Sequence, residues 1–200
     1  MAIARQAADI WAARAAAGQD FEAAWKLAKA CYWIGTHDEE ARRRRALERG
    51  VTAGEQAVKL KPDAPEGHFW MAANMGALAE SFGLRQGLKY RGDVKEELET
   101  VLRLHAAYLQ GSADRGLGRW YFKVPGLFGG SNRKSQEHLR KSLTYHPQRI
   151  ASRFFLAETL EDMGRESDAI RTLREIETLA VDPEWVPEDL EFKQKARAML

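Results

Sequence analysis

The sequence predicts an all-α protein, built as a stack of about ten helices in antiparallel pairs. Two observations favour this fold: glycines and prolines interrupt apolar helical patterns at short intervals, and no useful length of chain alternates apolar and polar residues. Apolar residues make up 44% of the chain and charged residues 30%, as in ordinary helical globular proteins. We expect one helical domain over residues 1–200.

Helix breakers divide the chain into ten expected helices. They span 3–17, 20–35, 39–60, 65–82, 93–110, 112–124, 132–145, 149–163, 166–179 and 187–200. The expected breaks between them are Gly18, Pro62 with Pro65, the segment 83–92, Gly111, the loop 125–130, Pro147, Gly164, and Pro183 with Pro187. Expected N-caps are Asp20, Asp93, Ser112 and Ser131, because their side-chain oxygens can accept hydrogen bonds from the first helical turn.

A recurring interval between small residues indicates helical repeats. Ala157 lies in an expected first helix, Gly164 closes that helix, and Ala169 lies in its partner. This spacing is the one that tetratricopeptide repeats use, because small residues let paired helices approach closely. Partial copies occur at Gly18 with Ala23, Ala57 with Pro62, Ser142 with Pro147, and Gly118 with a late Ser135. We therefore expect a right-handed superhelix of tetratricopeptide-like antiparallel helix pairs.

The charge and the apolar pattern exclude several classes of partner. There are 31 basic and 29 acidic residues, a near-balance that argues against a general electrostatic hold on nucleic acid. The four consecutive arginines at 42–45 do not form a nucleic-acid patch on one side of a helix, because consecutive side chains project in different directions around the helix axis. No run reaches the ~18 apolar residues that a membrane helix needs. The single cysteine, Cys31, allows no internal disulfide and is expected to be buried.

No set of residues predicts an enzyme, a metal site or a cofactor. The five histidines include no pair at i, i+4, and the lone cysteine has no companion ligand. His68 lies in a run of aromatic residues, where a packed imidazole is expected rather than a metal ligand. A Gly-x-Ser-x-Gly elbow is missing, as is any strand to hold one. Most aromatic residues are expected to fill the core between helix pairs.

The segment after the sixth expected helix is a candidate anion site. Ser131 begins a helix whose free N–H groups, together with Arg133 and Lys134, can hold a carboxylate or sulfate. A nucleotide loop is not expected there, because Arg133 stands where a glycine must precede the lysine. The alternative is a glycine-rich connection that only turns the chain.

A basic stripe suggests a binding groove along the first helices of the pairs. Arg115, Arg119 and Lys123 are spaced by four and so share one helix face. The corresponding faces of the neighbouring first helices carry Phe69, Trp70, Ala73 and Ala77 on one side, and Phe154, Glu158, Glu161 and Asp162 on the other. Such a groove would receive an apolar ligand with an anionic end, or a peptide of both charges. The alternative is that the basic and acidic stripes pair with each other across neighbouring helices.

One stretch resembles a known family. The sequence Leu117-Gly118-Arg119-Trp120-Tyr121-Phe122-Lys123-Val124-Pro125-Gly126-Leu127-Phe128-Gly129-Gly130-Ser131 resembles a hallmark of the T-component proteins associated with TRAP transporters. The helix and Tyr145-His146-Pro147 that follow also fit, as do Lys61-Pro62-Asp63 and the aromatic helix from Gly67. The resemblance covers roughly residues 40–180. The regulators of microtubule dynamics share a similar Gly-Arg-Trp region.

The resemblance implies an accessory protein of TRAP-type solute uptake. It implies a solute-binding protein as partner, a small organic ligand, a homo-oligomer and a periplasmic location. The sequence shows no signal or lipidation cysteine near its start, so a complete native chain would be cytoplasmic. The alternative function is a peptide-binding adaptor with no small ligand.

Overall fold

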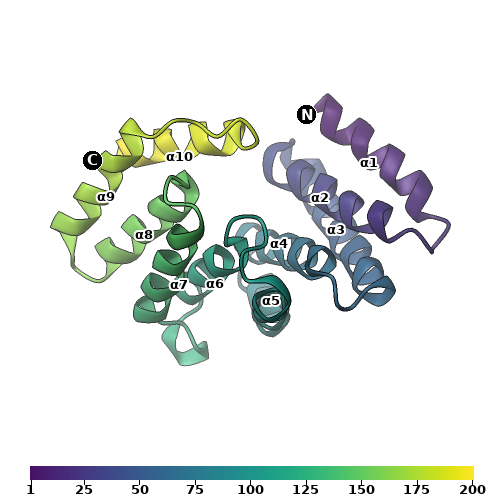
Figure 1. Ribbon diagram of the computed structural model, residues 1–200, viewed down its shortest axis with the longest axis horizontal. Helices are drawn as coiled ribbons and strands as arrows, with labels where there is room; N and C mark the ends of the chain where they lie inside the picture. Colours follow the sequence, from purple (N-terminus) through teal and green to yellow (C-terminus); the bar gives the residue numbers. More distant parts are fainter. The chain divides into compact units, whose positions relative to one another are not determined.

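The computed structural model is helical throughout (Figure 1). It describes the backbone of residues 1–200 and all side chains except those of residues 84 and 85. Its elements are α1 (Ala2–Ala15), α2 (Phe21–His37), α3 (Glu40–Leu60), α4 (Pro65–Ser81), α5 (Leu84–His105), α6 (Ser112–Lys123), the 3₁₀ helix η1 (Gly126–Phe128), α7 (Asn132–Tyr145), α8 (Ile150–Asp162), α9 (Glu166–Thr178) and α10 (Val186–Met199). The described backbone has no strand, which confirms the all-α prediction.

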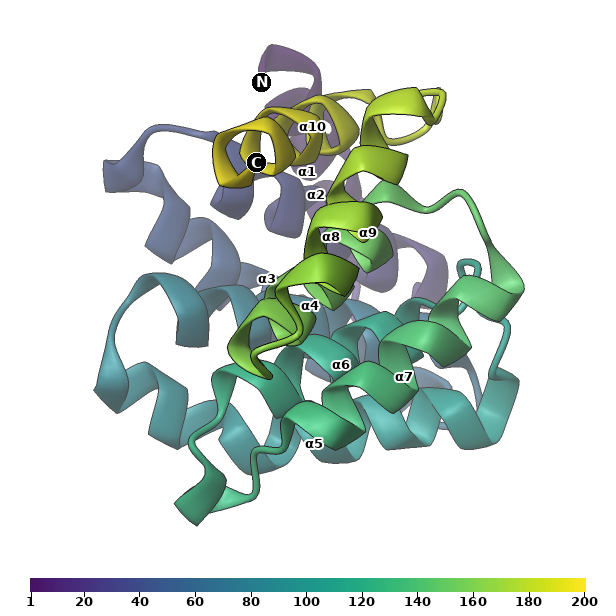
Figure 2. The same ribbon diagram turned by 90° about the vertical axis from the view of Figure 1, so that its left-hand side faces the viewer.

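The helices pack as pairs within two compact units. Residues 1–105 form the first unit, in which α2 packs on α3, α4 packs on α5, and α1 covers α2. Residues 106–200 form the second, in which α6 packs on α7, α8 packs on α9, and α10 rests on α8 and α9. Within each unit the first helices of successive pairs also touch, α2 with α4 and α6 with α8. Figure 2 shows the successive helices from a second side.

No helix among the described residues combines the length and the apolar character that crossing a membrane requires. The prediction of a single domain over residues 1–200 stays a prediction, because each unit has its own set of internal contacts.

The predicted helix boundaries agree with the structure to within two residues, except at α5. This helix begins at Leu84 and ends at His105, whereas the sequence predicted 93–110. The predicted break from Gly83 to Gly92 is therefore wrong for residues 84–92, which are helical. It is correct at Gly83, whose φ of +84° separates α4 from α5. A glycine within a helix costs only about 1 kcal/mol relative to alanine. Burial of Tyr90 and Val94 on this helix offsets that cost.

The C-terminal end of α5, at His105, comes five residues before the predicted end at 110. Leu109, Gln110 and Gly111 have φ of 43°, 58° and 75°, so the chain cannot continue as a right-handed helix there.

Two of the four predicted N-caps are confirmed. The Oδ1 atom of Asp20 accepts from the Ala23 N–H at 2.9 Å, and the Ser131 hydroxyl accepts from the Lys134 N–H at 3.4 Å. Asp93 lies inside α5 and caps nothing. Ser112 is the first residue of α6, and its hydroxyl donates to the Tyr108 carbonyl at 3.0 Å. Gly111 holds the cap position instead.

Glycines bring α3 against α4 in the first unit. A Cβ atom at Gly50 would lie 2.1 Å from Asn74 Oδ1, and one at Gly54 would lie 2.6 Å from Met71 Cβ. Asn74 is fully buried, and its Nδ2 donates to the carbonyls of Ala28 at 3.0 Å and Trp70 at 2.7 Å. Asn74 therefore ties α4 to α2 while its amide rests on α3.

Small hydroxyl residues join α7 to α8 in the second unit. Ser135 and Thr159 share a hydrogen bond of 2.9 Å, and Ser142 and Ser152 share another of 2.9 Å, both buried. The small residues Gly118, Ser135 and Ser142, which the repeat pattern singled out, thus lie at helix contacts. A Cβ at Gly118 would lie 2.5 Å from the Leu139 side chain.

A buried arginine anchors the last helix. Arg149 is 1% exposed, and its guanidinium donates to Glu188 at 2.5 Å and Asp189 at 3.3 Å while lying 4.4 Å from the centre of the Trp185 ring. Burial raises the pKa of Asp189 above its ordinary value, although Arg149 and the Asp182 N–H oppose this. The arginine therefore fixes where α10 docks more than it adds net stability.

We predict that Gly50→Ala lowers the free energy of unfolding by about 2 kcal/mol, because its methyl group displaces a hydrogen-bonded amide. Urea unfolding of this variant, Asn74→Ala and the double variant measures the coupling. The double variant should lose less stability than the sum of the single variants. Gly92→Ala is the control, since nothing lies within 4 Å of its added Cβ, and it should gain up to about 1 kcal/mol. If the stability losses of Gly50→Ala and Asn74→Ala simply add in the double variant, residues 50 and 74 are not in energetic contact.

Candidate functional site

The apolar part of the predicted groove lies in α4 of the first unit. Phe69 is 8% exposed and Trp70 is 1% exposed, and their rings meet edge to face with centroids 5.0 Å apart. Both side chains therefore belong to the core of the first unit, and other residues cover the Trp70 ring almost completely.

The charged part of the predicted groove lies in the second unit. Arg119 on α6 donates to Glu158 on α8 at 2.6 Å, and its guanidinium lies 4.5 Å from the centre of the Phe155 ring. The sequence left two alternatives open for the basic stripe: a ligand-binding groove, or pairing with acidic residues of the neighbouring first helix. Arg119 has the second arrangement. This pair bridges α6 and α8.

The other charged residues of that groove differ in burial. Arg115 is 8% exposed, whereas Lys123 is exposed with its ammonium 5.3 Å from the Phe122 ring centre. Asp162 is exposed and accepts from Asn132 Nδ2 at 2.5 Å. Lys123 is thus the member of the basic stripe that solvent reaches most freely.

The candidate anion site opens α7. Ser131 caps the helix, Arg133 lies 3.6 Å from Glu137 with both side chains exposed, and Lys134 lies 5.3 Å from the Tyr121 ring centre. A Cβ at Gly130 would lie 1.6 Å from the Val124 carbonyl oxygen, so the turn itself requires glycine. The glycine-rich connection therefore has a structural reason.

One face of α2 gathers aromatic side chains and lysine at the surface of the first unit. We call it the α2 face. It consists of Trp25, Lys29, Tyr32, Trp33 and Thr36, which share one side of the helix and are all partly exposed. The opposite side of α2 is buried. The expectation that most aromatic residues fill the core does not anticipate this face, although the spacing of 25, 29, 32, 33 and 36 places these residues on one helical stripe.

Lys29 is the charged centre of the α2 face. Its ammonium lies 5.5 Å from the centre of the Trp70 ring, and the Tyr32 ring lies 5.7 Å from the same ring. Among the described side chains no carboxylate forms an ion pair with Lys29. A cation over an aromatic face is held in place yet keeps its charge available to an anion.

Small residues of α4 lie beside the α2 face. Ala73, Gly76 and Ala77 share the partly exposed side of α4, and nothing lies within 4 Å of a Cβ built at Gly76. Since α2 and α4 are in contact, the aromatic side chains of the α2 face and the small residues of α4 border a common surface.

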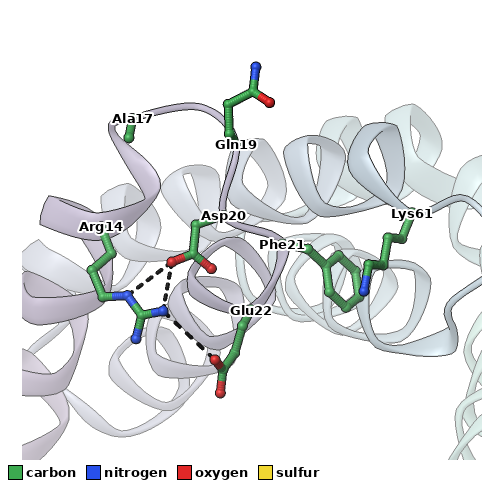
Figure 3. Close-up of a pocket in the computed structure, with 7 residues that line it drawn as sticks. All are labelled: Arg14, Ala17, Gln19, Asp20, Phe21, Glu22 and Lys61. Carbon is green, nitrogen blue, oxygen red and sulfur yellow. Dashed lines mark hydrogen bonds and ion pairs between the residues drawn. The ribbon is translucent and has the colours of Figure 1, made fainter.

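An open hollow of about 550 Å³ lies at the turn between α1 and α2 (Figure 3). Arg14 reaches across it to Asp20 at 2.7 Å and Glu22 at 3.7 Å, and Lys61 lies 4.8 Å from the Phe21 ring centre. The Ala23 N–H and then Arg14 lower the pKa of Asp20, and Lys26 is the main cause of the lowered pKa of Glu22. The charges of this hollow are therefore balanced by the protein itself.

A second hollow, of about 490 Å³, adjoins the same turn on the side of α3. It is lined by Gly18, Gln19, Thr52, Glu55, Gln56, Lys59 and Leu60. Neither hollow is lined by a residue of the predicted groove.

His68 links three segments of the first unit. Its Nδ1 hydrogen-bonds the Glu97 carboxylate on α5, and its Nε2 lies 2.9 Å from the Pro62 carbonyl before α4. Both partners only accept, so the doubly protonated imidazole satisfies both contacts. The Glu97 hydrogen bond is the main reason that the pKa of His68 is raised. No group of three potential ligands among histidine, cysteine, aspartate and glutamate comes together in the described part of the chain.

Comparison with family models finds one match over residues 7–128, to the model described as Regulator of microtubule dynamics protein 1-3. This match covers the whole α2 face and ends just before Gly129. It gives no support to the T-component family, which the stretch 117–131 had suggested. Comparison with curated proteins finds no match.

Solved structures show the fold. The crystal structure of TTC0263, a thermophilic tetratricopeptide-repeat protein of Thermus thermophilus, is 20% identical, with a TM-score of 0.65 over 90% of this chain and 81% of that one. The crystal structure of MamA is 14% identical, with a TM-score of 0.57 over 96% of this chain and 90% of that one. The chain therefore has a tetratricopeptide-like helical fold, as the interval from Ala157 to Ala169 predicted.

We predict that His68→Gln lowers the free energy of unfolding by about 2 kcal/mol near pH 6, because a charged hydrogen bond to Glu97 is lost. A raised folded pKa means that this contribution is complete below the ordinary pKa of about 6.5 and is lost as pH rises through the folded value. The difference between wild type and variant should therefore shrink towards alkaline pH. Urea unfolding at several pH values measures it, and a difference independent of pH would refute the protonated link.

Proposed function

The chain belongs to the family of Regulator of microtubule dynamics protein 1-3, and from this premise we propose that it is a non-enzymatic helical-repeat scaffold that binds a segment of a partner protein. The α2 face, with the small residues of α4 beside it, is the proposed binding surface. It lies within the matched residues 7–128.

The observation that carries this proposal is the position of Lys29. Its ammonium lies over the Trp70 ring without an ionic partner among the described carboxylates, and partly exposed aromatic side chains surround it. Aromatic residues enriched at a surface favour protein contacts, because they bring large area at little cost in side-chain entropy. A cation at their centre selects for a carboxylate.

These features favour one class of partner segment. An acidic side chain would meet Lys29, and neighbouring apolar side chains would lie against Trp25, Tyr32 and Trp33. Ala73 and Ala77 leave room for the backbone of the segment beside α4. The fold supplies the rigid support, since Trp70 beneath Lys29 is 1% exposed.

We predict that a random peptide library selected on the protein yields acidic residues next to apolar ones. Fluorescence anisotropy of a selected peptide should show that Lys29→Glu weakens binding about tenfold or more, since attraction becomes repulsion. Arg45→Glu is the matched control, because Arg45 is an exposed cation on α3 of the same unit. If Lys29→Glu and Arg45→Glu bind the peptide equally, the α2 face is not the site.

A second candidate is the accessory role in TRAP-type uptake, with a small organic ligand and a solute-binding protein as partner. The stretch 117–131 favours it, as does the exposed ammonium of Lys123 at the end of the basic stripe. In this role the groove of Arg115, Arg119, Glu158 and Asp162 meets the ligand or partner, and the protein is periplasmic and oligomeric.

Native mass spectrometry of the freshly purified protein tests the second candidate. We predict that a retained small organic acid or an oligomer appears if this role is correct, and that Lys123→Glu reduces the retained acid. An empty monomer would leave the peptide-binding scaffold as the function. The two candidates thus give different spectra from the same sample.

A further inference from the structure

The segment between α6 and α7 displays apolar side chains to solvent. Leu127 is 89% exposed and Phe128 is 42% exposed, and Leu127 is the most exposed of the large apolar side chains described. Figure 2 shows this segment projecting beyond the ends of the two helices that it joins. We call residues 124–130 the α6–α7 tip. The proposed peptide surface on α2 does not include it.

Hydrogen bonds define the conformation of the tip. The Phe128 and Gly130 N–H groups donate to the Pro125 carbonyl at 2.8 and 3.2 Å, and the Ser131 N–H closes the base on the Tyr121 carbonyl at 2.8 Å. Gly129 has φ of +102°, and Gly130 leaves no space for a Cβ. The chain is therefore shaped so that Leu127 points outward, and binding would not have to order it first.

Basic residues flank both stems of the tip. Lys123 ends α6, while Arg133 and Lys134 lie in the first turn of α7. Residues 123–134 contain these three bases and no acid. The ammonium groups of Lys123 and Lys134 lie over aromatic rings at 5.3 Å each, and all three basic side chains are exposed.

We propose that the α6–α7 tip docks the protein on an anionic lipid surface. Leu127 and Phe128 enter the region between headgroups and acyl chains, and Lys123, Arg133 and Lys134 contact the headgroup phosphates and carboxylates. An apolar insertion and a basic patch are the two signals that together give stable attachment at a membrane surface. The charge is local, since the whole chain carries only +2.

The shape of the tip favours lipid over a protein pocket. Leu127 stands out on a convex turn, and a fluid bilayer accepts such a side chain without a preformed cavity of matching shape. The three bases flank the apolar residues along the chain, Lys123 at the end of α6 and Arg133 and Lys134 at the start of α7. The free N–H groups of α7 add to this attraction for phosphate.

The test is flotation of the full chain with phosphatidylcholine vesicles, with and without about 30 mol% phosphatidylserine. We expect binding to the anionic vesicles at least about tenfold tighter than to the neutral ones, weakening as salt rises from about 50 to 300 mM. Leu127→Glu should lose about tenfold or more of this binding. The matched apolar control is Ile3→Glu, because Ile3 is 82% exposed on α1.

Charge reversal provides a second, independent comparison. Lys123→Glu with Lys134→Glu should abolish the preference for anionic vesicles, whereas Arg45→Glu with Arg174→Glu changes the net charge equally at exposed sites elsewhere and should weaken binding far less. Circular dichroism checks that all variants are helical.

Three results would overturn the proposal. One is no binding of the wild type to anionic vesicles, which would favour a protein pocket as the occupant of the tip. Another is equal binding by Leu127→Glu and the wild type. The third is loss of binding when about 10 mM inorganic phosphate replaces chloride at constant ionic strength, since the site would then select a free anion.

Discussion

The contact of Asn74 with Gly50 is the constraint on which the first unit depends. One buried amide donates to two carbonyls, of Ala28 on α2 and Trp70 on its own helix, while its oxygen lies where a side chain on α3 would have to be. Three helices thus meet at one polar side chain, whose Nδ2 makes two hydrogen bonds while its buried Oδ1 packs on α3 with no hydrogen-bond partner among the described atoms. Since Trp70 lies one turn before Asn74, this junction also sets where the Trp70 ring supports Lys29.

Several cations of this protein are ion-paired between helices, whereas, among the described side chains, Lys29 is not. In the second unit, Arg119 is paired with Glu158 and Arg149 with Glu188 and Asp189, so these cations hold helices together. In the first unit, Lys29 lies over the Trp70 ring, and we propose that an acidic residue of a partner meets its ammonium. Arg119 and Arg149 also lie over aromatic rings, but each is committed to a carboxylate within the protein, whereas Lys29 has no ion pair among the described carboxylates. For this reason the proposed function is assigned to α2 rather than to the basic stripe of α6.

Helix boundaries were predictable from the sequence wherever a proline or a positive-φ glycine ends the helix locally. Proline before α4 and α8, and glycine after α1 and α8, end helices through local sterics that tertiary contacts do not alter. Gly87 and Gly92 weaken a helix only slightly, so packing of α5 on α4 decided that segment. Likewise, the period of Trp25, Lys29 and Tyr32 identifies a helix face, but not whether a neighbouring helix covers it.

By itself, the sequence determined that the protein is helical, that its helices form tetratricopeptide-like pairs, and that small residues such as Gly118 and Ser135 lie between them. These properties follow from local spacing and from side-chain size. Only the tertiary structure decided which aromatic residues are core and which are surface, that Arg119 pairs with Glu158, and that Leu127 is exposed. The physical reason is that burial and ion pairing depend on which helices become neighbours, and that is a property of the whole packing rather than of any one segment.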